Sequence, residues 1–565
     1  MSFATTPSVS PLLVNGQRRW LEPWALTALV IATLVAIPIV SVVSIALAPR
    51  ENIWPHLADT VLPIYLWNTF VLLAGVGITV LLTGVSTAWL VTMCRFPGKR
   101  LFEWLLLLPM AVPAYVIAYV YTDLLEYAGP VQSVLRNVFA WQSAVDYVFP
   151  QIRSMGGAIF LMGVVLYPYV YLMARSAFLE QSVNTLEASR VLGQGPWRTF
   201  FKVALPIARP SIAIGLALAL VETLNDYGTV DFFAVRTLTT GIYDVWLKMN
   251  NVGGAAQIAS VMLSFVVLLI ALERMGRRNK RFYQTSSSRF KQLPEYDLHG
   301  WRRWAAMTVC VAPVVVGFVI PAILLLRYAV KHFNASWTTE FQQYAFNSLL
   351  VSTLAAFSAL TLALFIAYAR RLRGSNTLTS VSTNIASLGY AVPGAVLAIG
   401  IIVPFAAMDN AIDNFMRNTI GVSTGLIFSG TVFALIFAYV VRFMAVAVGS
   451  VDSSLTKISP SMDMASRSLG FKPMKILLKF HVPLIRGGML TGVLLVFVDC
   501  MKELPATLIL RPFNFDTLAT HVYQFASDEL IEQAALGSLL IVACGLLPVA
   551  LLSRTISDSR KLPVH

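Results

Sequence analysis

The chain has 565 residues, of which 57% are hydrophobic and only 12% are charged, and its mean hydropathy is +0.71. A soluble globular protein carries about 25% charged residues. The composition therefore excludes an ordinary water-soluble enzyme and indicates a membrane protein with many apolar stretches of about 20 residues. The net charge of +14 does not indicate nucleic-acid binding, because Lys and Arg accumulate in the cytoplasmic loops of membrane proteins.

The apolar stretches are continuous rather than alternating, which predicts membrane-spanning helices. The first stretch follows Arg18 and Arg19 and exceeds the core of about 7–15 residues that a cleaved signal peptide has, so we expect it to be retained. Twelve spans are predicted, at residues 24–48, 66–94, 101–125, 156–179, 208–230, 253–272, 304–329, 345–369, 380–407, 421–449, 487–510 and 533–553.

Basic residues gather in alternate loops. If both termini lie in the cytoplasm, 32 of the 42 Lys and Arg residues fall on the cytoplasmic side, and this asymmetry predicts that orientation. Apart from the N-terminal tail, the predicted cytoplasmic segments hold the basic residues within 95–100, 175–209, 274–303, 370–373, 442–486 and 554–561.

The polar and basic stretch at 274–303 is the predicted cytoplasmic linker between two halves. The expected organisation is an N-terminal tail (1–23), a first half (24–273), the linker, a second half (304–553) and a C-terminal tail (554–565). Because each half has an even number of spans, both enter the membrane the same way up. The predicted fold class is an all-α integral membrane protein of about 12 transmembrane helices in two parallel six-helix repeats.

Short motifs recur in the two halves at nearly constant spacing. A Glu-Ala-Ser-Arg-Val-Leu-Gly loop at 187–193 matches Met-Ala-Ser-Arg-Ser-Leu-Gly at 464–470, and each is followed by a proline 13 residues after its glycine. Three further pairs support the duplication: Asn68-Thr69 with Asn347-Ser348, Val112-Pro113 with Val392-Pro393, and Gly215 with Gly492.

Each repeated loop predicts a short helix followed by a turn. In the first copy Asn184 is a candidate N-cap with Glu187 as its capping-box partner. In the second, Ser459-Pro460 predicts a cap followed by proline in the first turn. Pro206 and Pro483 disfavour helix in the residues before them, so we expect a bend before the chain re-enters the membrane.

Both loops resemble the Glu-Ala-Ala…Gly…Leu-Pro loop of permeases of binding-protein-dependent ABC importers. In that family the loop forms a coupling helix that docks in a groove of an ATPase subunit. The resemblance implies a coupling role for Glu187, Ala188, Ser189, Gly193 and Pro206, and for Asp463, Ala465, Ser466, Gly470 and Pro483. Met464 replaces the glutamate in the second copy, so Asp463 is a candidate substitute and the two ATPase contacts are expected to be unequal.

Four acidic residues form a second repeated feature, in the span after each loop. Glu222 and Asp226 lie four residues apart, as do Asp499 and Glu503, so each pair shares one helical face. Acids at membrane depth usually face a water-filled path or a partner. With Tyr227 they are candidate ligands for a hard cation. Two alternatives remain: Lys502 pairs with Asp499 or Glu503, or the acids lie near the outer surface in a structural role.

Nearly the whole chain is similar to the fused permeases of ferric iron importers, notably in Asp226-Tyr227-Gly228-Thr229-Val230 and in the segment 502–520. The similarity implies a permease in the bacterial inner membrane, working with two copies of an ATPase subunit, a periplasmic or extracytoplasmic binding protein and membrane lipid. ATP and Mg are expected on the ATPase subunits. The alternatives are a permease for thiamine, a polyamine or another small solute, and an ion-coupled secondary carrier.

No phosphate-binding loop of the form Gly-x-x-x-x-Gly-Lys-Ser/Thr occurs in the sequence, so we expect no ATP or other cofactor on this chain. The six His residues are scattered and suggest no catalytic triad. The four Cys residues have no metal-binding or redox spacing. We therefore predict a transport subunit without catalytic activity of its own.

Overall fold

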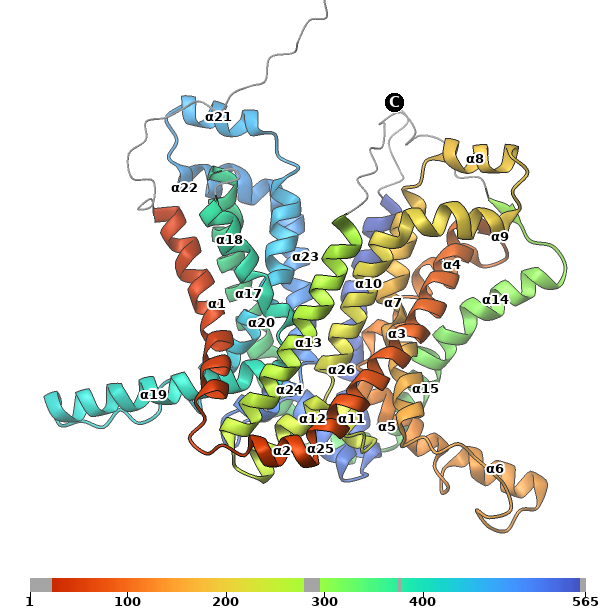
Figure 1. Cartoon of the computed structure of the whole chain (residues 1–565), viewed down its shortest axis with the longest axis horizontal. Coiled ribbons are helices and arrows are strands. Elements are labelled where there is room, and N and C mark those ends of the chain that lie inside the picture. The colour runs from red at the N-terminus through yellow and green to blue at the C-terminus, as the bar shows by residue number, and fades with distance from the viewer. Residues whose placement is uncertain (1–22, 279–294, 374–376, 559–565) are drawn as a thin grey trace, which may run out of the picture.

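A computed structural model describes residues 23–278, 295–373 and 377–558, and its long elements are all helices (Figure 1). Within these residues, 11 helices are long and apolar enough to cross a membrane, or up to 12 if a bent pair counts as one more span. This confirms the predicted all-α membrane fold.

The first half runs from α1 to α13, with the two-residue strand β1 (Cys94–Arg95) after α3. Its helices are α1 (Pro23–Leu47), α2 (Trp54–Thr60), α3 (Leu62–Met93), α4 (Lys99–Leu105), α5 (Ala114–Leu125), α6 (Pro130–Phe139), α7 (Met155–Leu179), α8 (Val183–Val191), α9 (Pro196–Thr199), α10 (Leu205–Asn225), α11 (Gly228–Phe232), α12 (Leu238–Tyr243) and α13 (Val252–Arg278).

The second half begins after strand β2 (Tyr296–Asp297), which pairs in parallel with β1. Its helices are α14 (Trp301–Val314), α15 (Ile320–Lys331), α16 (Phe333–Ser336), α17 (Thr339–Arg373), α18 (Thr377–Ala386), α19 (Gly394–Ile420), α20 (Val432–Leu455), α21 (Pro460–Ser468), α22 (Pro473–Ile476), α23 (Val482–Met501), α24 (Pro505–Leu510), α25 (Leu518–Ser527) and α26 (Ile531–Asp558).

The predicted third span, 101–125, is a broken helix rather than a straight one. Helical segments Lys99–Ala111 and Ala114–Phe139 meet at an angle of 89°. Val112 between them is extended, with ψ of 124°, because the ring of Pro113 disfavours helix in the preceding residue. Val392 before Pro393 is likewise extended, with ψ of 100°. The repeated Val-Pro pairs therefore interrupt helices, although we expected them inside continuous spans.

The leading helix of each half packs against the other half. Helix α1 contacts α17, α18 and α19, while α14 contacts α3 and α15 contacts α5. The crossing of α1 over α19 is very close, since a Cβ added to Gly400 would clash with the backbone oxygen of Pro38. The two halves are thus intertwined rather than packed as separate bodies.

The repeated Asn-Thr and Asn-Ser pairs hold equivalent turns. The Asn68 side chain donates to the carbonyl of Arg236, and that of Asn347 donates to the carbonyl of Asp516. The neighbouring hydroxyls, Thr69 and Ser348, accept the backbone N–H groups that start α12 and α25. The sequence duplication therefore corresponds to a duplicated structure.

Two triplets of packed helices form the centre of the molecule, α3, α7 and α10 in one half and α17, α20 and α23 in the other. Gly215 allows α10 to approach α7, because an added Cβ would lie 2.7 Å from the carbonyl oxygen of Tyr169. Gly492 occupies the equivalent place in α23 and faces Ser450 of α20. The triplets diverge toward the end that carries α8 and α21 (Figure 1).

Candidate functional site: paired end helices and a central cavity

The two repeated loops form matching short helices, α8 and α21, at the same end of the molecule (Figure 1). Each is followed, two residues after its last helical residue, by a glycine in the left-handed region, Gly193 with φ of 72° and Gly470 with φ of 78°. Nothing lies within 4 Å of a Cβ added to either glycine. Glycine is therefore favoured at these positions by the backbone conformation and not by lack of space. The left-handed conformation costs other residues about 1–2 kcal/mol.

The starts of the two helices differ from each other. Ser459 caps α21, accepts the N–H of Ser461 and is followed by Pro460, as predicted. The capping box at Asn184 and Glu187 was wrong, because α8 already begins at Val183 and its N-cap is Ser182, which makes no side-chain cap hydrogen bond. Asn184 lies inside the first turn, where its side chain is exposed.

One face of each short helix is exposed and the other is packed. Ala188 and Ala465 are exposed, whereas Ser189 and Ser466 are buried. The hydroxyl of Ser189 lies 2.9 Å from that of Thr199. The alanine and serine therefore do not form one small-residue patch. The alanines face outward, both serines are buried, and the Ser189 hydroxyl fastens α8 to the chain that follows it.

Large apolar side chains surround the exposed alanines. Near α8 these include Val191 and Trp197, which are 87% and 73% exposed, and near α21 they include Met464 and Leu469, which are 64% and 74% exposed. Such clustered exposure is typical of a surface that another protein covers.

Asp463 does not take the outward place of the missing glutamate. Its carboxylate accepts two hydrogen bonds from Arg371, at 2.9 and 2.7 Å, and lies 2.9 Å from Nε2 of the buried His481. Only 16% of the Asp463 side chain is exposed. The residue fixes α21 from within, and the outward residue of the second copy is Met464.

The first copy is held differently, by the end of the segment between the halves. The guanidinium of Arg190 lies 4.1 Å from the ring centre of Tyr296 and donates to the carbonyl of Glu295. Lys99 and Arg95 form ion pairs with the Glu295 carboxylate at 2.7 and 3.1 Å. Partial burial opposes ionisation of this carboxyl, but its hydrogen bonds with Lys99 and Arg95 hold the pKa of Glu295 below its usual value.

The two prolines do not produce the predicted bends. Pro206 and Pro483 lie in the first turns of α10 and α23, and each helix is preceded by a π-helical turn, Phe200–Ala204 or Leu477–His481. The wider turn shifts the hydrogen-bond register ahead of a residue that has no N–H. The helices consequently continue from α9 and α22, and the chain instead turns at the glycines before them.

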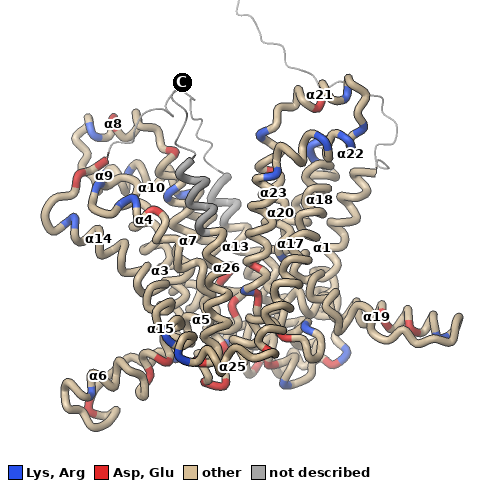
Figure 2. The backbone as a smooth tube through the Cα atoms, turned by 180° about the vertical axis from the view of Figure 1, so that it is seen from behind, with Lys and Arg blue, Asp and Glu red and all other residues tan. Residues whose placement is uncertain are grey.

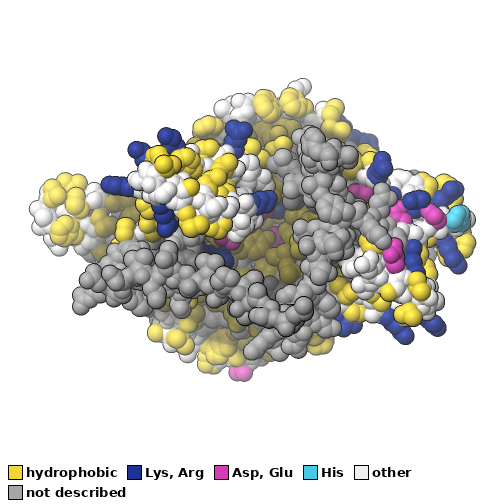
Figure 3. Space-filling model, turned by 90° about the horizontal axis from the view of Figure 1, so that it is seen from above, with side chains coloured by type: hydrophobic (Ala, Val, Ile, Leu, Met, Phe, Trp, Pro, Cys, Tyr) yellow, Lys and Arg dark blue, Asp and Glu magenta, His cyan; other side chains and the backbone are white. Residues whose placement is uncertain are grey.

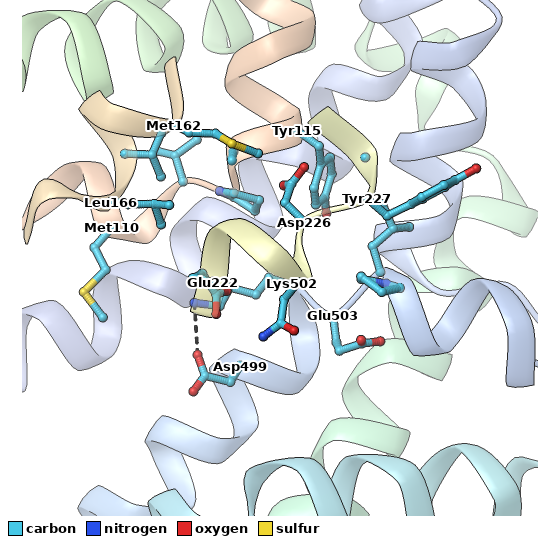
Figure 4. A pocket seen from close by; sticks show the side chains of 18 of the residues that line it. Met110, Tyr115, Met162, Leu166, Glu222, Asp226, Tyr227, Asp499, Lys502 and Glu503 are labelled. Atoms are coloured by element: carbon cyan, nitrogen blue, oxygen red, sulfur yellow. Dashed lines mark ion pairs between the residues drawn. The ribbon is translucent and has the colours of Figure 1, made fainter. Parts of the chain in front are cut away.

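A cavity of about 90 Å³ lies between the halves, and the four predicted acids and Tyr227 all line it (Figure 4). Seen from the side of α8 and α21, the surface is hollowed between the halves (Figure 3). A cavity of this size holds several water molecules and is below the roughly 300–1,000 Å³ of a site for a drug-sized ligand.

Two of the four carboxylates cap short helices at the cavity. Asp226 accepts the backbone N–H groups of Thr229 and Val230 at the start of α11. Glu503 accepts those of Ala506 and Thr507 at the start of α24. Both carboxylates therefore have a structural role.

Basic side chains balance part of the acidic charge. Arg442 Nη1 lies 2.7 Å from Glu503 Oε1, and Lys502 Nζ lies 3.0 Å from Asp499 Oδ1. Arg442 was wrongly assigned to a cytoplasmic segment, since it is buried inside α20. Its position inside the predicted span 421–449 was the sequence signal that could have shown its burial. The residue 277 positions earlier is Val165, so the ion pair has no counterpart in the first half.

The four carboxylates share a cavity without forming one metal site. In the described part of the chain, no group of three or more His, Cys, Asp or Glu side chains could hold a metal ion. Three of the four acids are already engaged with helix ends or basic side chains. The four carboxylates are therefore not a preformed ligand cluster, and the transient contact with a cation predicted for them stays a prediction.

An intertwined pair of membrane repeats, with matched end helices and a charged central cavity, defines a transport permease. Residues 80–281 match the family model of binding-protein-dependent transport system inner membrane components. The chain belongs to this family and is a multi-pass permease subunit of an ABC importer in the inner membrane, a transport component.

Relatives of the chain are named for the transport of three different substrates. The chain is 26% identical to the Fe(3+)-transport system permease protein FbpB 2 of Haemophilus influenzae, over 86% of this chain and 89% of the relative. It is 31% identical to the molybdenum transport system permease protein ModB of Escherichia coli, over 34% of this chain and 86% of the relative. It is 29% identical to the E. coli sulfate transport system permease protein CysT, over 34% of this chain and 71% of the relative.

Proposed function

We propose that this chain is the permease subunit of a ferric iron importer. The observation that carries the proposal is the charge of the central cavity, where four carboxylates face two basic side chains, Arg442 and Lys502. An excess of fixed negative charge attracts a cation and repels an oxyanion. Likeness over most of both chains to a permease named for Fe(3+) transport supports the same substrate.

The two end helices, α8 and α21, are the proposed docking sites for two ATPase subunits. Ala188, Met464 and the exposed apolar side chains around them support this role, together with glycine-terminated turns of the same geometry in both copies. ATP-driven closure of the ATPase pair would draw the two helices together and change access to the cavity. Met464 of the second copy is equivalent to Glu187 of the first, so the two proposed ATPase contacts differ in charge.

The end carrying α8 and α21 is the proposed cytoplasmic end. Lys and Arg residues gather there (Figure 2), which supports this orientation under the positive-inside rule. Both termini and the linker at 274–303 are predicted to lie on that side; of these, residues 1–22, 279–294 and 559–565 are outside the described part of the chain. A binding protein would deliver the substrate at the opposite end, near α2 and α25.

A transport assay tests the substrate. The chain is reconstituted in liposomes with its ATPase and its binding protein, and uptake of radiolabelled iron(III) citrate and of molybdate is measured with and without ATP. We expect ATP-dependent uptake of iron only. Uptake of molybdate without iron would replace the proposal by the oxyanion function named for some relatives, and uptake that persists without ATP would indicate a secondary carrier.

A further inference from the structure

Two tyrosines and an aspartate meet beside the central cavity, at the end of the molecule opposite α8 and α21 (Figure 1). Tyr227 and Asp231 stand at the start of α11, and Tyr523 lies in α25 of the second half. The Tyr523 hydroxyl lies 2.7 Å from Asp231 Oδ2 and 3.4 Å from the Tyr227 hydroxyl. In Figure 4 the Tyr227 ring borders the cavity, and its hydroxyl points away from Glu222 and Asp499. These three side chains, called the tyrosine cluster below, are therefore distinct from the four acids.

The oxygen atoms of the tyrosine cluster are close enough to bind one ion. Small hard cations hold oxygen ligands at about 2.0–2.1 Å, so two ligands of one ion lie at most about 4.2 Å apart. Both separations from the Tyr523 hydroxyl are below this limit. The Asp231 N–H donates to the Tyr227 carbonyl at 2.9 Å, which sets these two residues on one face of a helical turn. Both side chains therefore reach the same hydroxyl, that of Tyr523.

The tyrosine cluster carries a negative charge without a basic partner. Within the described residues, Asp231 forms no ion pair with Lys, Arg or His, and its one side-chain hydrogen bond comes from Tyr523. In the same part of the chain, the Tyr227 hydroxyl contacts no polar atom except that of Tyr523. Asp231 and Tyr523 are partly exposed, so an ion can reach them from water. An uncompensated carboxylate beside two phenols favours a cation.

The duplicated fold carries this set of oxygens in one half only. The residues 277 positions after Tyr227 and Asp231 are Leu504 and Leu508, whose side chains have no ligand atoms. The repeat therefore does not require a phenol or a carboxylate at either position for folding.

Tyr523 does have a counterpart, but its role is different. Tyr523 and Tyr243 each stand six positions after the threonine that caps their helix, Thr517 or Thr237. The Tyr243 hydroxyl donates to the carbonyl of Pro505 at 2.5 Å, which is a structural contact with the backbone. The Tyr523 hydroxyl instead meets two side chains that can act as ligands.

We propose that Tyr227, Asp231 and Tyr523 form an entry site that binds the ferric ion before it enters the cavity. Phenolate and carboxylate oxygens are the ligands that a hard, highly charged cation prefers. Because Tyr523 comes from one half and the other two ligands come from the other, relative movement of the halves would separate the ligands and release the ion. This inference rests on the proposed transport of ferric iron.

Binding at this site exchanges protons for the ion. At each phenol the O–H bond breaks, a bond from oxygen to iron(III) forms, and the proton passes to water, while the iron stays ferric. Burial and the Asp231 carboxylate raise the pKa of Tyr523, so its proton remains until a cation of high charge displaces it.

Visible absorption tests the site, because charge transfer from a phenolate to iron(III) gives a band that a colourless or carboxylate-only site lacks. The full chain in nanodiscs of zwitterionic lipid is titrated with iron(III) nitrilotriacetate, and we expect the band in the wild type. Loss of a group that only orients a metal ligand already costs about 10–100-fold in affinity. Tyr227→Phe and Tyr523→Phe should therefore each weaken binding at least about tenfold, and the double variant should lose the band. Asp231→Asn keeps both phenols, so it should weaken binding equally but retain the band at saturation.

Tyr328→Phe is the matched control. The Tyr328 hydroxyl donates to Asp123 at 2.5 Å, so this variant removes a tyrosine–aspartate hydrogen bond outside the tyrosine cluster and should keep the wild-type band. Absence of the band from the wild type would overturn the proposal, as would a wild-type band in the double variant Tyr227→Phe/Tyr523→Phe. Equal loss of the band in Tyr328→Phe would also overturn it, because the band would then report the fold and not the cluster.

The binding and transport assays separate this inference from the proposed function. If the wild type gives the band but its complex imports molybdate and no iron, the proposed function fails while the site stands. If the complex imports iron and the double variant imports it at the same rate, the function stands and the entry site fails. We expect iron import by the wild type and by Tyr328→Phe, and a loss of at least about tenfold in the double variant.

Discussion

Arg442→Met removes the cation that faces Glu503 in the centre of the second half. The two side chains are 7% and 1% exposed, and their charged atoms are 2.7 Å apart. Breaking a buried ion pair by removing one partner costs about 3–5 kcal/mol, because the remaining charge is uncompensated. Glu503 keeps hydrogen bonds from Ala506 and Thr507, so we expect the lower end of this range, about 3 kcal/mol.

Thermal unfolding measured with a thiol-reactive dye suits this test, because Cys94, Cys310 and Cys500 are buried in the native chain. We expect the apparent Tm of Arg442→Met to fall by roughly 3 °C or more. The double variant Arg442→Met/Glu503→Gln should regain most of the loss, since Gln still accepts the N–H groups at the start of α24 and carries no charge. A wild-type Tm for the single variant, or no recovery in the double variant, would refute the reasoning.

Three further predictions concern the end helices. Gly193→Val and Gly470→Val should each impair ATP-driven uptake while Asn at the same positions preserves it, because Asn tolerates positive φ and Val does not; equal uptake by Val and Asn variants would contradict the role of the turns. Asp463→Ala should speed hydrogen exchange in α21 without changing α8, since it releases Arg371, and unchanged exchange in α21 would count against this. Glu295→Gln should loosen α8 instead. Because the pKa of Glu295 is lowered, its ion pairs with Lys99 and Arg95 should persist at neutral pH. They should be lost only as the pH falls below about 4.3, the usual pKa of Glu, and through the lowered pKa. Loss of the protection of α8 from hydrogen exchange already at pH 6 would refute this.

The duplicated architecture was predictable because it depends on short sequence segments that recur in both halves. Apolar length identifies the spans, and Asn68 and Asn347 recur because each closes the same turn through a backbone carbonyl. The glycines that end α8 and α21 were also predictable, since a helix end in the left-handed region favours glycine at both places.

Features that depend on side-chain partners were not predictable. Asp463 looked like a substitute for the glutamate missing at Met464, but Arg371 and His481 come from other elements and draw it inward. The prolines at 206 and 483 predicted bends. The π-helical turn before each proline instead shifts the hydrogen-bond register, so the helix continues although proline has no N–H. Local propensity cannot show such compensation, because it is made by neighbouring turns.

Helical spacing predicted that the acids lie near one another, and all four line the cavity, but it did not predict the partners of each acid. Spacing sets Glu222 and Asp226 on one face, while the end of α10 at Asn225 turns Asp226 into the cap of α11. Where a helix stops decides whether an acid faces the cavity or a helix end, and helix ends are the least certain part of sequence interpretation.

Movement of the paired end helices is the central claim, and a distance measurement tests it most directly. Spin labels at Ala188→Cys and Ala465→Cys, both exposed positions, report the α8–α21 separation by pulsed electron paramagnetic resonance in the complex with its ATPase. We predict a shorter distance when ATP is bound than in its absence, and a return after hydrolysis. An unchanged distance in a complex that hydrolyses ATP and transports its substrate would contradict the account.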